Sequence, residues 1–183
     1  MSEALAPAPE AEGAGESGDL SSLLSVALEQ GATEARVIPA ASVVTAAWVR
    51  LRCQYGCGRY GSSRCCPPHA PTPEEMRRVL DGYRRAILFR GRRLKDPTAI
   101  VLKLERQAFL VGFYKAFGLG AGPCRLCATC DLTAACQHPK HARPAMEACG
   151  IDVYATVRDN GMPIHVLTSE DDQGDYYGLL LVD

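Results

Sequence analysis

Apolar residues recur every three or four positions in two parts of the chain, and this spacing predicts two amphipathic helices. The first covers Leu20 to Gln30 and ends at Gly31, a common helix stop. The second opens at Asp96-Pro97 and is expected to run through about Lys115. Because 47% of the residues are hydrophobic, the chain can build an ordinary globular core around such helices.

A third helix is predicted from capping chemistry rather than from periodicity. Thr72 suits the N-cap, and Pro73 suits the first helical position. Glu74 and Glu75 then place negative charge in the first turn, where the helix dipole favours it. We expect this helix to end near Tyr83.

Short apolar and β-branched runs predict the strands. Two further stretches, 42–51 and 151–158, are compatible with either a strand or a helix, and a short helix is expected over 143–148. Strands are expected over 34–39, 86–89, 163–168 and 176–182, with the last two joined by an acidic turn at 170–175.

These elements predict an α+β fold in a single compact domain that covers residues 20–183 and carries two cysteine-rich metal-binding loops. Residues 1–19 are rich in Ala, Glu, Pro and Gly and contain almost nothing to bury. We therefore expect a disordered N-terminal tail ahead of the domain.

Composition and charge argue against several classes of partner. The formal net charge of −1 gives no global electrostatic reason to bind nucleic acid or an anionic membrane surface. No apolar run approaches the roughly 18 residues that a membrane span needs. The N-terminus lacks the basic and apolar regions of a secretory signal, so we expect a cytoplasmic protein. No pattern sets the oligomeric state.

The cysteines carry the strongest chemical signal. Eight of the nine fall into two runs of four, a first run Cys53-x3-Cys57-x7-Cys65-Cys66 and a second run Cys124-x2-Cys127-x2-Cys130-x5-Cys136. Thiolates at such spacing can converge on a metal centre, and soft sulfur ligands favour zinc, copper(I) or iron–sulfur clusters. In a reducing cytosol these runs indicate metal ligands or redox groups rather than structural disulfides.

The second run resembles the ferredoxin loops in which C-x2-C-x2-C holds a [4Fe–4S] cluster. Because Cys136 has no distant partner motif, we assign all four cysteines of this run to one site. Gly118, Gly120 and Gly122 precede the run and permit close backbone approach, which suits a buried cofactor. The alternative is a zinc ribbon-like site that only stabilises the fold, although such sites usually place two C-x2-C pairs on separate knuckles.

The first run is less regular. Neighbouring side chains point apart, so Cys65 and Cys66 are not expected to bind the same metal ion. We expect three ligands with a candidate fourth in Cys65 or His69, and the three are Cys53, Cys57 and Cys66. An open fourth position would leave one iron of a [4Fe–4S] cluster able to bind substrate, solvent or a ligand from a partner.

Three further features remain. His138 and His141 are either polar loop residues or, beside the second run, hydrogen-bond donors or a replacement ligand. Cys149 is expected to be a small buried apolar residue. A basic run is either a solvated surface or a docking patch for an acidic redox partner or a phosphorylated ligand, and it contains Arg77, Arg78, Arg84, Arg85, Arg90, Arg92, Arg93 and Lys95.

Longer motifs surround both cysteine runs. They read C-x3-C-x2-YG-x4-CPP followed by PTPEE, then AFGLGAGPCRLCATC, CQHPKHARPAMEACGIDV and YYGLLLVD. From about Arg36 to the C-terminus the chain resembles an uncharacterised prokaryotic family of predicted metal-binding proteins, a domain of unknown function with two cysteine clusters. In that family the residue before Cys-Pro-Pro is often not cysteine, which argues against Cys65 as a ligand. The resemblance implies metal binding by Cys53, Cys57 and Cys66 and by Cys124, Cys127, Cys130 and Cys136.

The sequence therefore predicts a metal-binding protein with one or two [4Fe–4S] clusters, acting in electron transfer or as a redox accessory protein beside a redox protein partner. One alternative is a zinc-stabilised interaction module without enzymatic activity. Another is an iron–sulfur enzyme that binds substrate at an open iron of the first cluster, and a last one is a carrier of metal or clusters. No pattern designates a catalytic residue.

Overall fold

The computed structural model describes residues 20–169 and 172–183, so the tail expected at 1–19 and part of the expected acidic turn lie outside the described residues. Its helices are α1 (Ser21–Glu29), α2 (Trp48–Gly56), α3 (Pro73–Asp81), α4 (Asp96–Leu110) and α5 (Val153–Asp159), with short 3-10 helices η1 (Ala40–Ser42) and η2 (Glu147–Cys149). Its strands are β1 (Glu34–Pro39), β2 (Arg85–Gly91), β3 (Phe117–Leu119) and β4 (Tyr176–Leu181).

The four strands form one antiparallel sheet in the order β1-β2-β4-β3. β2 and β4 occupy the centre, where Leu88 lies opposite Leu179. Side chains along these two strands are almost all buried, although successive side chains point to opposite faces. The sheet must therefore be covered on both sides.

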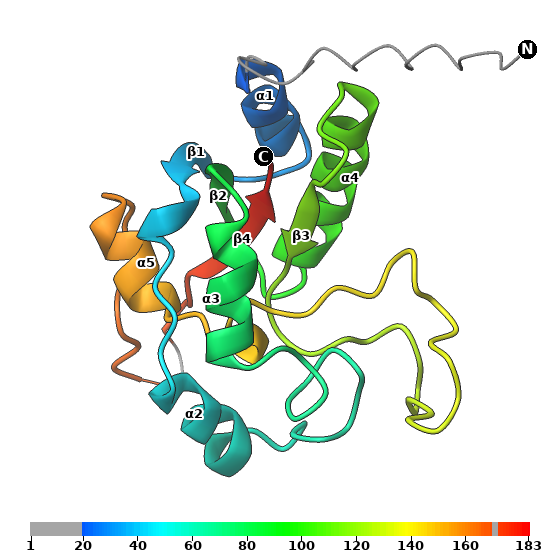
Figure 1. Cartoon of the computed structure of the whole chain (residues 1–183). Helices are drawn as coiled ribbons and strands as arrows, with labels where there is room; N and C mark the ends of the chain where they lie inside the picture. Colours follow the sequence, from blue (N-terminus) through cyan, green and yellow to red (C-terminus); the bar gives the residue numbers. More distant parts are fainter. Residues whose placement is uncertain (1–19, 170–171) are drawn as a thin grey trace, which may run out of the picture.

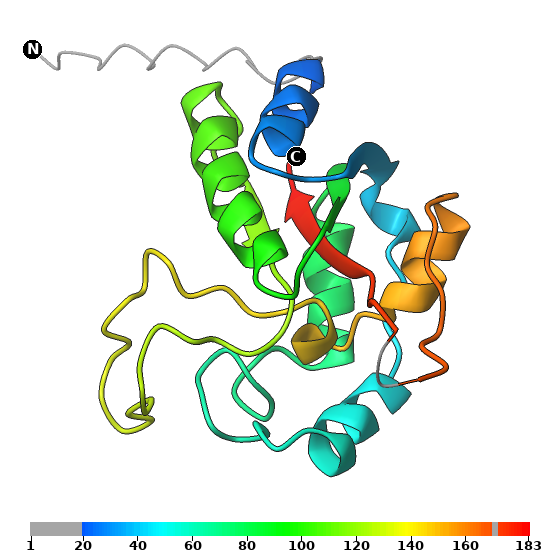
Figure 2. The same ribbon diagram turned by 180° about the vertical axis from the view of Figure 1, so that it is seen from behind.

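Helices provide that cover on each face, which gives three layers (Figure 1 and Figure 2). Ile87 and Phe89 of β2 pack in one core cluster with residues of α1 and α4, such as Leu104. Leu88, between them, packs in a second cluster with residues of α3 and α5, such as Leu80. The predicted α+β fold in a single compact domain is confirmed.

Local signals account for several elements. The Thr72 hydroxyl accepts a hydrogen bond from the Glu75 backbone N–H at 3.1 Å, and the Glu75 carboxylate accepts one from the Thr72 N–H at 2.8 Å. This capping box starts α3 at Pro73 as predicted. The ambiguous stretch 42–51 leads into helix α2, and the stretch 151–158 forms helix α5.

Two helices are shorter in the structure than the sequence predicts. Helix α4 ends at Leu110 rather than near Lys115, because Gly112 adopts a φ of +101° in the left-handed region and breaks the helical path. The chain after it forms β3, which the sequence analysis missed because the run is only three residues long. The helix expected over 143–148 is reduced to the single 3-10 turn η2.

The strand expected over 163–168 is also wrong. β4 already pairs with β2 on one side and with β3 on the other, so neither of its edges is free to accept another strand. Residues of this segment form other hydrogen bonds, one to β4 and one to the residue just before β4. The Tyr177 hydroxyl donates to the Pro163 carbonyl, and the His165 N–H donates to the Asp175 carboxylate at 3.2 Å.

No helix in the described part of the chain combines the length and the apolar character that crossing a bilayer requires.

Asp183 links the end of β4 to the start of β2. Its carboxylate accepts hydrogen bonds from Arg85 Nε at 3.0 Å and from Arg84 Nη2 at 3.2 Å. The Arg85 hydrogen bond is the main cause of a pKa below the ordinary value for Asp183; partial burial opposes it and Arg84 supports it. A depressed folded-state pKa means that the stabilisation is present above the unfolded-state pKa of about 3.9 and is lost as pH falls through the folded-state value.

We therefore expect Asp183→Asn to lower the free energy of unfolding by about 1 kcal/mol at neutral pH, with the difference from wild type disappearing as pH falls through the lowered folded-state pKa. Urea unfolding across this pH range measures it. The matched control is Asp81→Asn, which removes an exposed ion pair with Arg77 and should cost less than about 0.5 kcal/mol. Parallel pH profiles for wild type and Asp183→Asn would contradict the assignment.

Candidate metal centres

Both cysteine runs lie at the end of the molecule opposite to α1 (Figure 1 and Figure 2). Helix α2 carries Cys53 and ends at Gly56, immediately before Cys57. A series of turns then leads through the rest of the first run to α3. The second run occupies the long loop between β3 and η2, which passes beside the first loop in both views. Segments far apart in the sequence therefore meet at one end of the domain.

Three cysteines of the first run face the same space. Cys53, Cys57 and Cys66 line one cavity of about 420 Å³. Cys66 is buried, Cys53 is half-buried and Cys57 is exposed. The Cys53 thiol donates a weak hydrogen bond to the Glu147 carbonyl, with an S···O distance of 3.9 Å. The first site thus brings together the three cysteines that the sequence analysis selected, and their role as ligands stays a prediction.

Arg50 sets the position of α2 beside this site. Its guanidinium donates hydrogen bonds to the Ala148 carbonyl at 3.1 Å and to the Ala70 carbonyl at 3.3 Å. One side chain thereby connects α2, η2 and the segment that follows Cys66. This connection determines where Cys53 lies relative to Cys66.

The two candidate fourth ligands do not line the first cavity. Cys65 and His69 line neighbouring cavities instead. The first cavity is lined by His165 and by Asp175, whose carboxylate is almost fully buried and lies 2.7 Å from His165 Nδ1. The Arg90 guanidinium forms an ion pair with the same carboxylate. The first site therefore presents three thiols to a cavity that also carries an imidazole–carboxylate pair.

Cys65 lies in the second site. The four cysteines of the second run line a cavity of about 170 Å³, and Cys65 lines it with them. Burial raises the pKa of Cys65 to about 12, with further contributions from Cys124 and Cys136. The second site therefore gathers five thiols from two segments of the chain, one more than the second run supplies.

Gly120 closes the base of the second loop. Its N–H donates to the Pro144 carbonyl at 2.9 Å, and its carbonyl accepts from the Met146 N–H at 3.1 Å. The nearby Gly118 packs directly on α4, where an added Cβ would lie 2.6 Å from Val101 Cγ2. These glycines therefore permit close packing of the loop entry on a helix, a role that the sequence analysis had connected with a cofactor.

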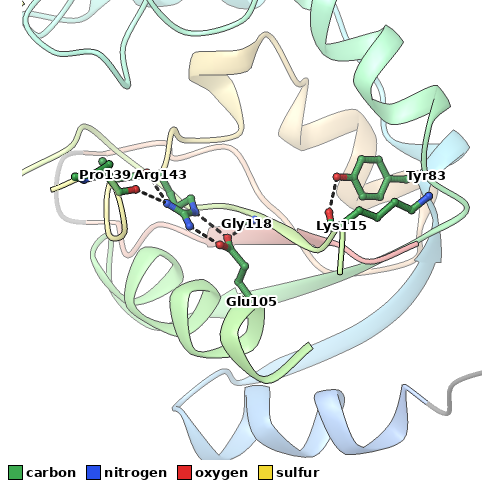
Figure 3. Close-up of polar contacts among 7 residues, drawn as sticks. Tyr83, Glu105, Lys115, Gly118, Pro139 and Arg143 are labelled. Carbon is green, nitrogen blue, oxygen red and sulfur yellow. Dashed lines mark hydrogen bonds and ion pairs between the residues drawn. The ribbon is translucent and has the colours of Figure 1, made fainter. Parts of the chain in front are cut away.

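An ion pair anchors the exit of the same loop to α4, as Figure 3 shows. The Glu105 carboxylate accepts hydrogen bonds from Arg143 Nε at 2.7 Å and from the Gly118 N–H at 2.8 Å. Arg143 Nη1 also donates to the Pro139 carbonyl at 3.3 Å. Both charged side chains are mostly buried, with exposed fractions of 18% for Glu105 and 11% for Arg143. Entry and exit of the second loop are thus connected to one carboxylate.

A second group of contacts in the same view holds the end of α3 to the chain before β3. The Tyr83 hydroxyl donates to the Lys115 carbonyl at 2.6 Å (Figure 3). The Lys115 ammonium in turn donates to the Gly82 carbonyl at 2.8 Å. These two hydrogen bonds connect the end of α3 to the chain just before β3.

Two further polar groups point to a bound ligand at the second site. The Ser63 side chain is only 4% exposed and lines the second cavity, yet its hydroxyl has no hydrogen-bond partner among the described residues. The His138 backbone N–H donates to Cys136 Sγ at 3.4 Å. Buried hydroxyl groups normally have partners, and N–H donors to sulfur tune metal–thiolate centres. The site's donors therefore fit a sulfur-rich metal cluster.

The thiols surround cavities rather than single points. Across residues 20–169 and 172–183, no three His, Cys, Asp or Glu side chains lie close enough to hold one metal ion.

The remaining residues from the sequence analysis lie elsewhere. Cys149 is fully buried in the core, as expected for a small apolar residue. His141 is exposed and does not line the second cavity. Five of the eight residues in the basic run form ion pairs with a total of four Asp side chains, and they are Arg77, Arg84, Arg85, Arg90 and Arg93.

Comparison with known proteins gives a family and no further relatives. Searches of curated proteins and of solved structures found no match. The family described as "Predicted metal-binding protein (DUF2284)" matches residues 36–182, which include both cysteine runs and the whole sheet except two residues of β1. The chain therefore belongs to this family of predicted metal-binding proteins.

Proposed function

We propose that this protein is an iron–sulfur redox protein that holds [4Fe–4S] clusters at its two thiol-lined sites and exchanges single electrons with a protein partner. The observation that carries the proposal is the grouping of the thiols around two separate cavities. Cys53, Cys57 and Cys66 would hold metal at the first site. Cys124, Cys127 and Cys130, with a fourth thiol, would hold it at the second. A bound cluster would supply one-electron chemistry.

The chain's own groups would control that chemistry. At the second site the His138 N–H donates to Cys136 Sγ, and the Ser63 hydroxyl, which has no partner among the described residues, would be available to a bound cluster; such donors favour the reduced, more negative state. At the first site burial raises the pKa of Cys53; the neighbouring Cys57 and Glu147 add to this, and the nearby Arg50 guanidinium partly offsets them. The sequence spacing C-x2-C-x2-C supports iron–sulfur over a zinc ribbon.

A specific observation favours a second candidate function, an iron–sulfur enzyme. The first cavity has a volume of about 420 Å³, within the range of small-molecule sites, and offers three thiols without a fourth cysteine. His165 and Asp175 would be available there to orient a polar group of a substrate. Turnover of a small molecule that is lost in His165→Ala, with the metal content unchanged, would favour this candidate over the relay.

Anaerobic purification tests the proposed function directly. We expect a brown protein with broad visible charge-transfer absorbance and, on the same sample, about four or eight irons per chain with matching sulfide. Reduction with dithionite should produce an electron paramagnetic resonance (EPR) signal. A colourless protein that carries zinc and no sulfide would overturn the proposal in favour of the zinc-stabilised module.

A further inference from the structure

Adjacent residues of the first run face different sites. Cys66 lines the first cavity together with Cys53 and Cys57. Cys65 lines the second cavity, and Ser63 and Arg64 line it too. The segment just before Cys66 is therefore part of the wall of the second site, although it belongs to the first run in the sequence.

Contacts across the two loops hold this segment in place. Arg64 Nη2 donates a hydrogen bond to the Leu132 carbonyl at 2.9 Å and another to the Ala134 carbonyl, both in the second loop. Asp131 fixes the same turn by accepting hydrogen bonds from the Thr133 and Ala134 backbone N–H groups. The neighbouring Ser63 side chain is buried in the cavity wall. Cys65 thus faces the second site beside Arg64, which is bound to that loop.

The second site then holds five thiols, whereas a [4Fe–4S] cluster takes four. Cys65 is buried, and the four cysteines of the second run are half-exposed. A buried thiol is costly to deprotonate unless a cation pairs with the thiolate, so burial alone does not rank Cys65 above the other four. Cys65 is selected by its position, because it lines this cavity and not the first one, and the adjacent Arg64 is bound to the second loop.

We propose that Cys65 is a ligand of the second metal centre, so that the Cys65–Cys66 dipeptide carries one ligand of each centre. This inference rests on the proposed function. The Cα atoms of neighbouring residues are about 3.8 Å apart, which makes this peptide a very short covalent connection between the sites. A one-electron donor protein would first reduce one centre. The electron would then pass along the Cys65–Cys66 dipeptide, so that this centre is oxidised again and the other centre is reduced. No bond is broken and no proton moves.

Three variants, reconstituted anaerobically with iron and sulfide, test the inference. Cys65→Ser should lose about four irons or change the EPR signal of the second centre, with the first centre unaffected. Cys66→Ser should do the reverse. Cys149→Ala, which alters a buried cysteine of the core, is the matched control and should keep both signals. Far-UV circular dichroism confirms that each variant is folded.

Trypsin cleavage after Arg125 is a second measurement, and it reports on the second loop whichever metal is bound. Bound metal should protect Arg125 from trypsin in Cys66→Ser. It should not protect Arg125 in Cys65→Ser. A zinc protein with this pattern would overturn the redox function while keeping the ligand assignment. The assignment would be overturned if Cys65→Ser kept the iron content, the EPR signals and the trypsin protection of the wild type. It would also be overturned if both variants lost the same centre.

The reduced wild-type protein should also show magnetic interaction between the two centres. Two independent EPR signals would argue against the covalent connection.

Discussion

Removal of the metal is expected to open the second cysteine loop to protease while the sheet and its helices stay folded. None of residues 122–142 is buried, so the second loop has no apolar core of its own. Neither of the two large core clusters contains any of residues 122–142. Bound metal would therefore be the main source of order in the loop.

We expect trypsin to cleave after Arg125 about 100-fold faster in metal-free protein than in loaded protein, because local opening then replaces a metal-held state. Mass spectrometry of timed digests measures the rate, and far-UV circular dichroism should remain close to that of the loaded form. Lys103 and Arg106 in α4 are internal controls, since they lie outside the loops. Complete unfolding on chelation would show instead that metal supports the whole domain.

Loss of the Glu105–Arg143 ion pair is expected to have the next largest effect. In Glu105→Gln the mostly buried Arg143 guanidinium loses its carboxylate, and the Gly118 N–H keeps only a neutral acceptor. Breaking a buried pair costs roughly 3–5 kcal/mol, and residual exposure reduces the expected loss here to about 2–3 kcal/mol. The entry and exit of the second loop both depend on this carboxylate.

The variant should therefore lose metal from the second site before the first. Urea unfolding measures the stability, and iron analysis with EPR measures the occupancy of each site. Glu34→Gln, which removes an exposed ion pair with Arg36, is the control and should change stability by less than about 0.5 kcal/mol. Unchanged loading and a loss below about 1 kcal/mol in Glu105→Gln would contradict an anchoring role.

Local chemistry explains the part of the fold that could be predicted. The capping box at Thr72 and Glu75 is complete within four residues, so the start of α3 follows from the sequence. β3 could not be predicted in the same way, because three residues form a strand only when β4 offers them an edge. The same competition for edges excludes a strand at 163–168.

The amino-acid sequence by itself determined which residues are candidate metal ligands, because thiol chemistry and spacing are local properties of the two runs. It also determined the family and the elements with strong local signals. Only the tertiary structure decided that Cys65 faces the second run, that Glu105 anchors Arg143, and that His165 reaches the first cavity. Each of these contacts joins residues more than 35 positions apart, so it exists only after the sheet and its helices have brought the loops together.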